Sequence, residues 1–325
     1  VILLAHLGEV DRGQTPIYTP TLLAKTRGID IVLDGHTHST IPGMKFTNMD
    51  GDNVYSMQTG TKFQHVGKLI ITADGKIITE LVPMTEITQS NAKVAQKVDD
   101  SKGKIEDKLK QEVGMNHCPN FILEDAEGKN TARYQCVPLG NLVCEAFRYT
   151  AGAQIGLANG GGVRTSLEQG MMTYGSLLNI LPFSNDLMVV SATGQQILDG
   201  LETAVKLYPM LSGGFMQCAG LRYEFDAANQ PELEFDPETY VLSVKGTRRI
   251  TKCEVQGDDG KYYPIDPAMK YTVASTTFVL KEGQEVVAFR QSEVIDEGIC
   301  TDLDALLNYV VKGLNGEIPA DYGLE

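Results

Sequence analysis

The stretch that decides the fold class reads IDIVLDGHTHS over residues 29–39. Its apolar start predicts a buried strand, and His36 and His38 follow where that strand ends. A second apolar run, Val1–Ala5, is followed in the same way by His6. Open α/β sheets bind ligands at the carboxyl ends of their strands, and histidine is the commonest transition-metal ligand. The pattern therefore predicts an α/β sheet whose edge carries part of a metal site, one that this chain cannot complete alone.

The segment that holds these histidines, residues 1–35, is predicted to form one strand–helix–strand unit. Thr19 suits an N-cap, Pro20 suits the first helical position, and Gly28 can end the helix in a left-handed cap. A right-handed crossover makes the two strands parallel, so their carboxyl ends share one edge of the sheet. We therefore expect the three histidines to approach one another despite their separation in sequence.

Bulk composition excludes several classes of function. The chain has 325 residues, enough for about two domains, and 42% of them are hydrophobic. The net charge of −14 argues against binding to nucleic acid or to anionic membranes, although local basic groups can still capture a small anion. No apolar run approaches the roughly 18 residues of a membrane span. Because the chain starts inside a predicted core strand, we expect further sequence upstream.

The six cysteines form no CxxC pair, which argues against a zinc knuckle or a dithiol redox motif. They are interpreted as buried thiols. Cys118 and Cys136 could instead form a disulfide in an exported protein, and the spacing leaves both alternatives open.

The rest of the chain divides into three parts. Residues 1–89 hold further predicted strands at Asn53–Met57, Val66–Thr72 and Lys76–Val82, with a hairpin turn at Asp74-Gly75. Residues 90–114 have a charge-rich helical pattern that Gly114 can cap, which predicts an exposed connecting helix. Residues 115–325 form a second α/β domain.

Capping signals and apolar runs outline that second domain. Pro138 can start a helix that reaches about Tyr149, and Thr173, Thr193 and Thr301 can cap three more. Strands are predicted at Gln154–Ala158, Leu187–Ser191, Leu221–Phe225, Tyr240–Val244 and Tyr271–Ser275.

Each histidine at a strand end has a plainer alternative, an ordinary loop residue that is hydrogen-bonded to the backbone. For one isolated histidine that alternative is favoured, but three at adjacent strand ends favour metal binding. Asp34 is expected to orient a histidine, and Glu9 is the other nearby carboxylate. These acids are too few for a two-metal centre. His65 and His117 lack this context and are interpreted as structural or surface residues.

A second candidate site follows the predicted strand at Gln154–Ala158. There the chain reads Asn159-Gly160-Gly161-Gly162-Val163-Arg164. Glycines such as Gly161 let backbone amides approach an anion, arginine binds phosphate with a planar fork, and asparagine can bind a hydroxyl or a ring nitrogen. The alternative is a tight turn with a surface arginine. Arg133 is a further candidate anion ligand, although taken alone it resembles a solvated arginine.

Two loop phenylalanines, Phe183 in Leu181-Pro182-Phe183 and Phe278 in Thr276-Thr277-Phe278, could stack on a flat ring. A phenylalanine is more often a core residue, and the sequence alone favours that alternative for both.

These strings together resemble the 5'-nucleotidase family, which includes the bacterial periplasmic UDP-sugar hydrolases. The resemblance covers nearly the whole chain, in the order Ala5-His6-Leu7-Gly8, Gly35-His36-Thr37-His38, Gly140-Asn141-Leu142, Asn159–Arg164 and Leu181-Pro182-Phe183. It implies the C-terminal part of a layered α/β metallophosphoesterase domain, a connecting helix, and a complete α/β nucleotide-recognition domain.

The resemblance also implies residue roles. Members of the family hydrolyse nucleotide phosphoesters with two divalent metals, often zinc or manganese. His6, His36 and His38 would be metal ligands. Arg133, Asn159 and Arg164 would bind the nucleotide, and Phe183 and Phe278 would clamp its base. The substrate would be a nucleotide or nucleoside, and the location periplasmic, extracellular or at the cell surface.

Two departures from the family pattern qualify this expectation. The family's early metal ligands, an Asp-x-His pair, a further Asp and an Asn-His pair, would precede Val1, so we expect little or no phosphatase activity from this chain alone. The aspartate that binds ribose in the family is replaced by Gln284. Two alternatives stay open: a non-catalytic nucleoside-binding module, and a related hydrolase with a non-nucleotide substrate such as a thiosulfate-bearing carrier.

Overall fold

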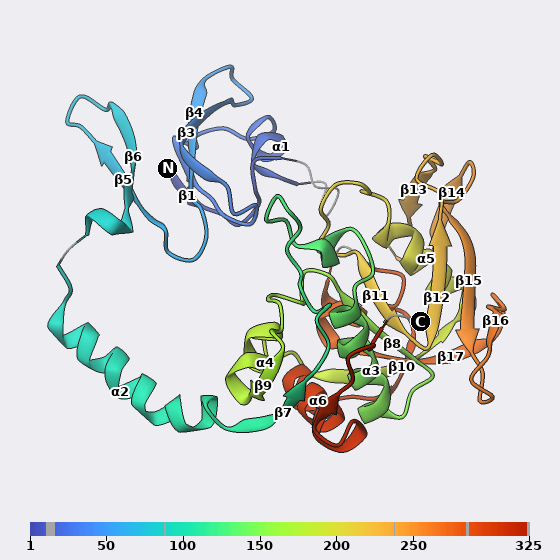
Figure 1. Cartoon of the computed structure of the whole chain (residues 1–325). Helices are drawn as coiled ribbons and strands as arrows, with labels where there is room; N and C mark the ends of the chain where they lie inside the picture. The colour runs from blue at the N-terminus through green and yellow to red at the C-terminus, as the bar shows by residue number, and fades with distance from the viewer. Residues whose placement is uncertain (11–16, 88, 237, 284–285, 324–325) are drawn as a thin grey trace. The chain divides into compact units, whose positions relative to one another are not determined.

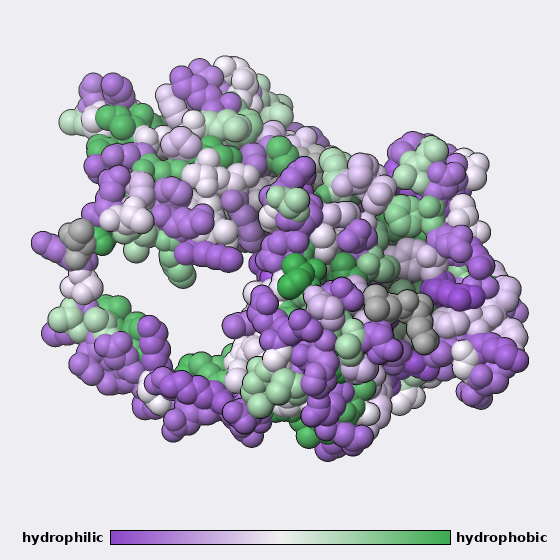
Figure 2. All heavy atoms as spheres, in the orientation of Figure 1, coloured by the Kyte–Doolittle hydropathy of each residue, from purple (hydrophilic) through white to green (hydrophobic). Residues whose placement is uncertain are grey.

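The computed structural model describes residues 1–10, 17–87, 89–236, 238–283 and 286–323. These residues form two compact units, Val1–Lys102 and Gly103–Glu325, in a mixed α/β architecture (Figure 1). None of the helices among the described residues combines the length and the apolar character needed to span a bilayer. Hydrophilic side chains cover most of the face seen in Figure 2, as expected of a chain with a net charge of −14.

The first unit is built on a four-stranded sheet in the order β1-β2-β4-β3. Its strands are β1 (Ile2–Leu4), β2 (Ile31–Leu33), β3 (Thr40–Thr47) and β4 (Asn53–Thr59). β1, β2 and β4 are parallel, and β3 is antiparallel to β4. β5 (His65–Ile71) and β6 (Ile77–Pro83) form a separate hairpin, and η1 (Met84–Glu86) follows it. The predicted parallel unit and the hairpin are therefore confirmed, whereas β3 was not predicted.

Helix α1 (Thr19–Leu23) differs in detail from its prediction. Tyr18 is the N-cap, because the helix begins one residue earlier than expected. Gly28 does adopt a left-handed φ of 73°, but it lies five residues beyond the end of the helix, so it is not the cap. Leu23 packs against Val32 and Val54 in the small core of this unit.

Helix α2 (Ala92–Leu109) follows, with no buried residue along its length, as the charge-rich pattern predicted. It ends before Gly114, which instead lies in strand β7 (Glu112–Asn116). A side chain at Gly114 would meet the Gly316 carbonyl oxygen at 2.2 Å. The glycine is therefore required by the pairing of β7 with β19 (Glu317–Ile318), and it does not cap the helix.

The second unit is organised around a five-stranded sheet in the order β11-β8-β17-β10-β18. Its strands are β8 (Ile155–Asn159), β10 (Leu187–Thr193), β11 (Met216–Ala219), β17 (Lys270–Thr276) and β18 (Glu293–Asp296). β8 and β17 are parallel, and the other neighbours are antiparallel. Three smaller sheets accompany it among the described residues. One has the order β19-β7-β9, where β9 is Gly170–Thr173, and another has the order β12 (Leu221–Phe225), β15 (Ile250–Gln256) and β16 (Tyr262–Pro264). The third pairs β13 (Glu232–Phe235) with β14 (Leu242–Lys245).

Alternating side chains of the central sheet enter two separate cores. Leu187 and Val189 of β10 face helices α3 (Pro138–Ala151), α4 (Tyr174–Ile180) and α6 (Asp302–Asn308). Met188 and Val190 face α5 (Gly194–Ala204) and the sheet of β12 and β15. Both faces of the sheet are thus covered, which is why its strands read as continuous apolar runs. Short irregular helices complete the unit at η2 (Thr131–Arg133), η3 (Phe278–Glu282) and η4 (Tyr309–Gly313).

The three threonine caps predicted in the second unit are confirmed. Thr173 and Thr193 form capping boxes with Ser176 and Gln196, and Thr301 accepts a hydrogen bond from the Asp304 amide. Each cap satisfies amides that would otherwise lack partners in the first turn.

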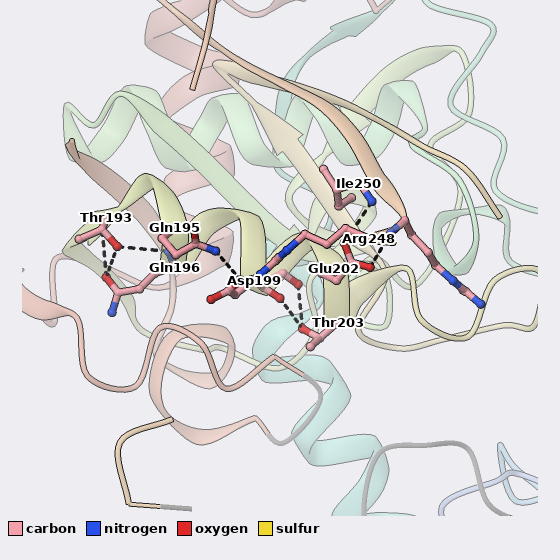
Figure 3. A network of polar contacts seen from close by, with 10 residues as sticks. Thr193, Gln195, Gln196, Asp199, Glu202, Thr203, Arg248 and Ile250 are labelled. Atoms are coloured by element: carbon pink, nitrogen blue, oxygen red, sulfur yellow. Dashed lines mark hydrogen bonds and ion pairs between the residues drawn. The ribbon is translucent and has the colours of Figure 1, made fainter. Parts of the chain in front are cut away.

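A buried polar network fastens α5 to the start of β15 (Figure 3). The Glu202 carboxylate accepts hydrogen bonds from the Arg249 and Ile250 amides at 2.7 and 3.1 Å. The Arg249 guanidinium donates to the carbonyls of Val205, Lys206 and Asn229 and to Gln230 Oε1, all within 2.9 Å. Burial of these charges is tolerated because backbone groups surround them.

The predicted alternative of a Cys118–Cys136 disulfide is wrong, because all six cysteines are free. The Cys118 thiol is buried and contacts the Tyr322 carbonyl oxygen at 3.7 Å, whereas the Cys136 thiol contacts the Met216 carbonyl oxygen at 3.8 Å.

Candidate functional site

The parallel register of β1 and β2 places the first two predicted metal ligands together. Leu4 pairs with Leu33, so His6 and Gly35 lie opposite each other just beyond the strands. A side chain at Gly35 would meet His6 Nδ1 at 3.0 Å, which explains the glycine. The rings of His6 and His36 lie edge to face, with centroids 5.3 Å apart.

The loop after β2 holds two histidines in an unusual backbone conformation. His36 and His38 have positive φ angles of 81° and 60°. Such a conformation costs on the order of 1–3 kcal/mol per residue, and it is concentrated at functional sites. Thr37 between them is buried, whereas both histidines are exposed. The backbone of this loop therefore keeps the two imidazoles accessible while the intervening threonine is anchored below.

The anchor of this loop is Glu9. Its carboxylate accepts hydrogen bonds from Thr37 Oγ1, from Ser39 Oγ at 2.6 Å and from Gln58 Nε2 at 2.7 Å. Burial alone would raise the pKa of Glu9, but the hydrogen bonds from Ser39, Thr37 and Gln58 outweigh burial, so the pKa lies below its ordinary value of 4.5.

Asp34 joins the same two loops from the other side. It accepts hydrogen bonds from the Leu7 and Gly8 amides at 2.8 and 3.2 Å, from the Gly35 amide, and from Thr19 Oγ1. These bonds make Asp34 an anchor between the ends of β1 and β2.

The donor chemistry of this edge suits a divalent transition metal, because three imidazoles occur in two adjoining loops. Across the described residues, however, no group of three or more histidine, cysteine, aspartate or glutamate side chains is arranged to hold an ion. Within the part of the chain that the structure describes, these imidazoles therefore do not form a complete coordination shell.

Replacing Glu9 by glutamine should flatten the acid-induced loss of stability in the first unit. A carboxyl group with a lowered folded-state pKa stabilises the fold above its ordinary pKa, and this contribution is lost as the pH falls through the folded-state value. The thermal midpoint of the wild-type chain, measured between about pH 6 and pH 3, should therefore fall more steeply than that of Glu9→Gln. Glu80→Gln, at an exposed carboxylate on β6, is the control and should follow the wild type. Equal slopes for Glu9→Gln and the wild type would contradict this role.

The second predicted site forms at one edge of the five-stranded sheet. Asn159 ends β8, and Phe278 begins η3 just after the parallel strand β17. Phe183 lies shortly before β10, whose first residue, Leu187, pairs with Thr276 at the end of β17. The Thr277 amide donates to the Asp186 carbonyl oxygen at 2.8 Å, which ties the two phenylalanine-bearing loops together.

Both phenylalanines are exposed, with 56% of Phe183 and 42% of Phe278 accessible to solvent. The core alternative that the sequence favoured is therefore wrong for both. The Arg164 guanidinium lies 5.5 Å from the centroid of the Phe183 ring and donates to the Gly161 carbonyl oxygen at 3.1 Å. This contact pre-orients an arginine fork beside an exposed aromatic face.

The glycines after β8 permit close packing of three backbone segments. A side chain at Gly160 would meet the Ala132 carbonyl oxygen at 1.9 Å and the Arg133 amide nitrogen at 3.2 Å. The half-buried Arg133 is thus held beside the end of β8, and its carbonyl oxygen accepts from the Ser212 amide at 2.9 Å.

Residues before β11, which were not predicted to take part, complete this edge. The Gly213 carbonyl oxygen accepts from Asn159 Nδ2 at 3.1 Å and from the Gly161 amide at 2.8 Å. In the sequence, Ser212-Gly213-Gly214 predicts only a loop. Its place in the second site becomes visible because the following strand, β11, pairs with β8. Gln284, which the resemblance was expected to place where the family has a ribose-binding aspartate, lies outside the described residues.

The comparisons with known proteins agree with this architecture. The chain is 27% identical over 336 residues to the trifunctional nucleotide phosphoesterase protein YfkN of Bacillus subtilis, covering 98% of this chain and 21% of that protein. It is 27% identical to the cell wall protein Lmo0130 of Listeria monocytogenes over 89% of this chain and 36% of that protein. The chain therefore spans well under half of each of these relatives.

Among solved structures, the 5'-nucleotidase precursor of Thermus thermophilus matches with a TM-score of 0.67 at 24% identity, covering 94% of this chain and 60% of that one. This match confirms the predicted α/β fold class. The family model described as "5'-nucleotidase, C-terminal domain" matches residues 119–291. Because that match spans more than half of the chain, this protein belongs to the 5'-nucleotidase family.

Proposed function

We propose that this chain carries the nucleotide-recognition part of a metal-dependent hydrolase that cleaves nucleotide phosphoesters. In this proposal residues 1–89 belong to a metallophosphoesterase domain, residues 90–114 connect the domains, and residues 115–325 bind the substrate. The observation that carries the proposal is the edge formed by Asn159, Arg164, Phe183 and Phe278, which combines exposed aromatic faces with a pre-oriented arginine.

The chemistry of a nucleotide matches that edge. Phe183 and Phe278 offer apolar faces on which a planar base can stack. Arg164 supplies a guanidinium fork for phosphate or ribose oxygens, and Arg133 adds a second positive charge beside the end of β8. Asn159 can both donate and accept hydrogen bonds, and one of its two side-chain N–H donors bonds the Gly213 carbonyl oxygen in this structure. UDP-sugars and cyclic nucleotides are further candidate substrates, because they share a base and an anionic phosphate.

For the metal centre, we propose that His6, His36 and His38 hold part of a two-metal site, with zinc or manganese as the ions. Such ions would neutralise charge on a phosphoryl group and lower the pKa of water. The chain's own contribution is positional, because Glu9 and Asp34 anchor the histidine loops. The further ligands are proposed to come from outside this chain, and the location to be periplasmic, extracellular or at the cell surface.

The binding experiment is a titration of adenosine and of AMP into the chain, monitored by isothermal calorimetry. Removal of a stacked ring by Phe183→Ala or Phe278→Ala should weaken binding about 5-fold or more, since an aromatic stack on a base contributes about 1–3 kcal/mol and about 1.4 kcal/mol is a factor of ten. Arg164→Lys should weaken AMP more than adenosine if the arginine binds phosphate. Phe63→Ala, at a 90% exposed phenylalanine of the first unit, is the matched control and should bind as the wild type does. Absence of binding to either ligand would overturn the assignment.

A turnover assay distinguishes a complete hydrolase from this chain alone. With zinc or manganese added, this chain alone should release phosphate from AMP at a rate indistinguishable from buffer, because its imidazoles do not close a coordination shell among the described residues. A rate near that of a complete 5'-nucleotidase, measured by phosphate release, would contradict the expectation.

Two other candidate functions would give different results in these experiments. A nucleoside-binding module would bind adenosine and would stay inactive when the missing ligands are supplied by a longer chain. A hydrolase of a non-nucleotide substrate, such as a thiosulfate-bearing carrier, would leave the affinity for adenosine and AMP undetectable. The exposed phenylalanine rings favour the nucleotide.

A further inference from the structure

Two positively charged side chains hold the helical segment that begins at Phe278. Lys281 lies on η3, and Arg290 follows the buried Phe289. The two side chains bond in opposite directions, because Lys281 donates to the segment around Arg290, and Arg290 donates to the end of η3. We call this pair the Lys281–Arg290 clasp.

The first half of the clasp is the Lys281 ammonium group. It donates to three carbonyl oxygens, those of Phe289 at 3.4 Å, Arg290 at 3.0 Å and Ser292 at 2.7 Å. An ammonium group has three N–H donors, so these carbonyls occupy all of them. Phe289 is 1% exposed and belongs to the core on the α5 side of the central sheet. Lys281 therefore attaches η3 to a fixed part of the unit.

The second half is the Arg290 guanidinium. It donates to the Glu282 and Gly283 carbonyl oxygens, at 3.3 and 3.1 Å, where η3 ends. The same guanidinium lies 5.1 Å from the centroid of the Tyr240 ring, and this cation–π contact restricts the arginine further. Each of the two segments thus donates to backbone carbonyls of the other.

The end of η3 packs against the Phe278 side chain. The Gly283 amide donates to the Phe278 carbonyl oxygen at 2.6 Å. A side-chain carbon added at Gly283 would lie 3.5 Å from Cε1 and 3.7 Å from Cζ of the phenylalanine ring, so this backbone borders the half-exposed ring. Val279 and Leu280 are buried and fix the start of η3, whereas the clasp fixes its end.

We propose that Lys281, together with Arg290, is a positioning residue that holds the Phe278 ring ready to stack on a nucleobase. This inference rests on the proposed function, in which Phe278 binds the base. A ring that is already ordered loses less conformational freedom when a base stacks on it, so the base binds more tightly. The Lys281 ammonium group serves the ring and not a phosphate, since backbone carbonyls occupy its donors.

The binding test compares Lys281→Met with the wild-type chain by calorimetry. We expect adenosine and AMP to bind about 5-fold more weakly, and to the same extent, as when one side chain has to be immobilised on binding. In a Phe278→Ala chain, Lys281→Met should have no further effect, because the ring through which it acts is gone. Lys270→Met, at an exposed lysine on β17, is the matched control and should bind as the wild type does.

Hydrogen exchange of the ligand-free chain gives a readout that does not depend on the proposed function. The Gly283 amide should exchange about 5-fold or more faster in Lys281→Met, because charged hydrogen bonds that hold the end of η3 are lost. Arg290→Met removes the other half of the clasp and should accelerate the same amide. It replaces Lys281→Met in both measurements if thermal unfolding shows that the lysine variant does not fold.

The possible results separate the two levels of the inference. Unchanged exchange at Gly283 in both variants would overturn the clasp. Additive losses of affinity in Lys281→Met and Phe278→Ala would overturn its action through the ring, and a larger loss for AMP than for adenosine would assign Lys281 to the phosphate instead. Absence of adenosine binding to the wild-type chain, with faster exchange in the variants, would overturn the proposed function and reduce the clasp to a structural contact.

Discussion

Replacing Arg249 by methionine should lower the free energy of unfolding of the second unit by about 4 kcal/mol or more, because its four acceptors lose a charged donor at about 1–3 kcal/mol each. Arg249 is 4% exposed, and its guanidinium donates to three carbonyls and to Gln230. Methionine fills similar volume, so the loss reports on the hydrogen bonds and not on a cavity. Urea denaturation followed by circular dichroism suits this chain, which contains no tryptophan.

The neighbouring arginine offers a matched control. Arg248 is 31% exposed at its side chain and bonds Asp199 Oδ1 at 2.7 Å, an oxygen that Gln195 also contacts at 2.8 Å. Arg248→Met should therefore cost about 1 kcal/mol, since Asp199 retains a donor and the lost ion pair is partly solvated. If Arg249→Met costs no more than Arg248→Met, the buried guanidinium is not the fastening element between α5 and β15.

Replacing Gly160 by alanine should separate the Arg133 segment from the end of β8. The added carbon would lie 1.9 Å from the Ala132 carbonyl oxygen, so one of the two backbone segments has to move. We expect the unit to lose about 1–3 kcal/mol, as for other overpacked sites. Displacement of Arg133 should also weaken AMP binding about 10-fold or more, since a loss of about 1.4 kcal/mol is a factor of ten in affinity.

The control for this substitution is Gly103→Ala, because Gly103 lies in α2 with no atom within 4 Å of the added carbon. It should stabilise the helix by about 0.5–1 kcal/mol and leave AMP affinity unchanged. Unchanged stability together with unchanged AMP affinity in Gly160→Ala would show that the approach of Arg133 to β8 is dispensable.

Local signals predicted the long elements of the fold well. The strands at Leu187 and Tyr271 were recognisable because both faces are buried, which produces uninterrupted apolar runs. Helices α4, α5 and α6 were recognisable from threonine caps, because a cap bonds amides only three residues away. Strand β3 was missed because Pro42 and Gly43 interrupt its pattern, and β18 was missed because all four of its residues are exposed.

For the two candidate sites, the sequence by itself determined which side chains stand at strand ends: the histidines after β1 and β2, and Asn159 with its glycines after β8. Strand ends are readable because apolar periodicity stops there. Only the tertiary structure decided that Phe183 and Phe278 are exposed and that the Gly213 carbonyl oxygen accepts a hydrogen bond from Asn159. The exposure of a side chain and the identity of its hydrogen-bond partner depend on segments that are distant in the chain. A local sequence pattern does not specify which distant segment packs against it.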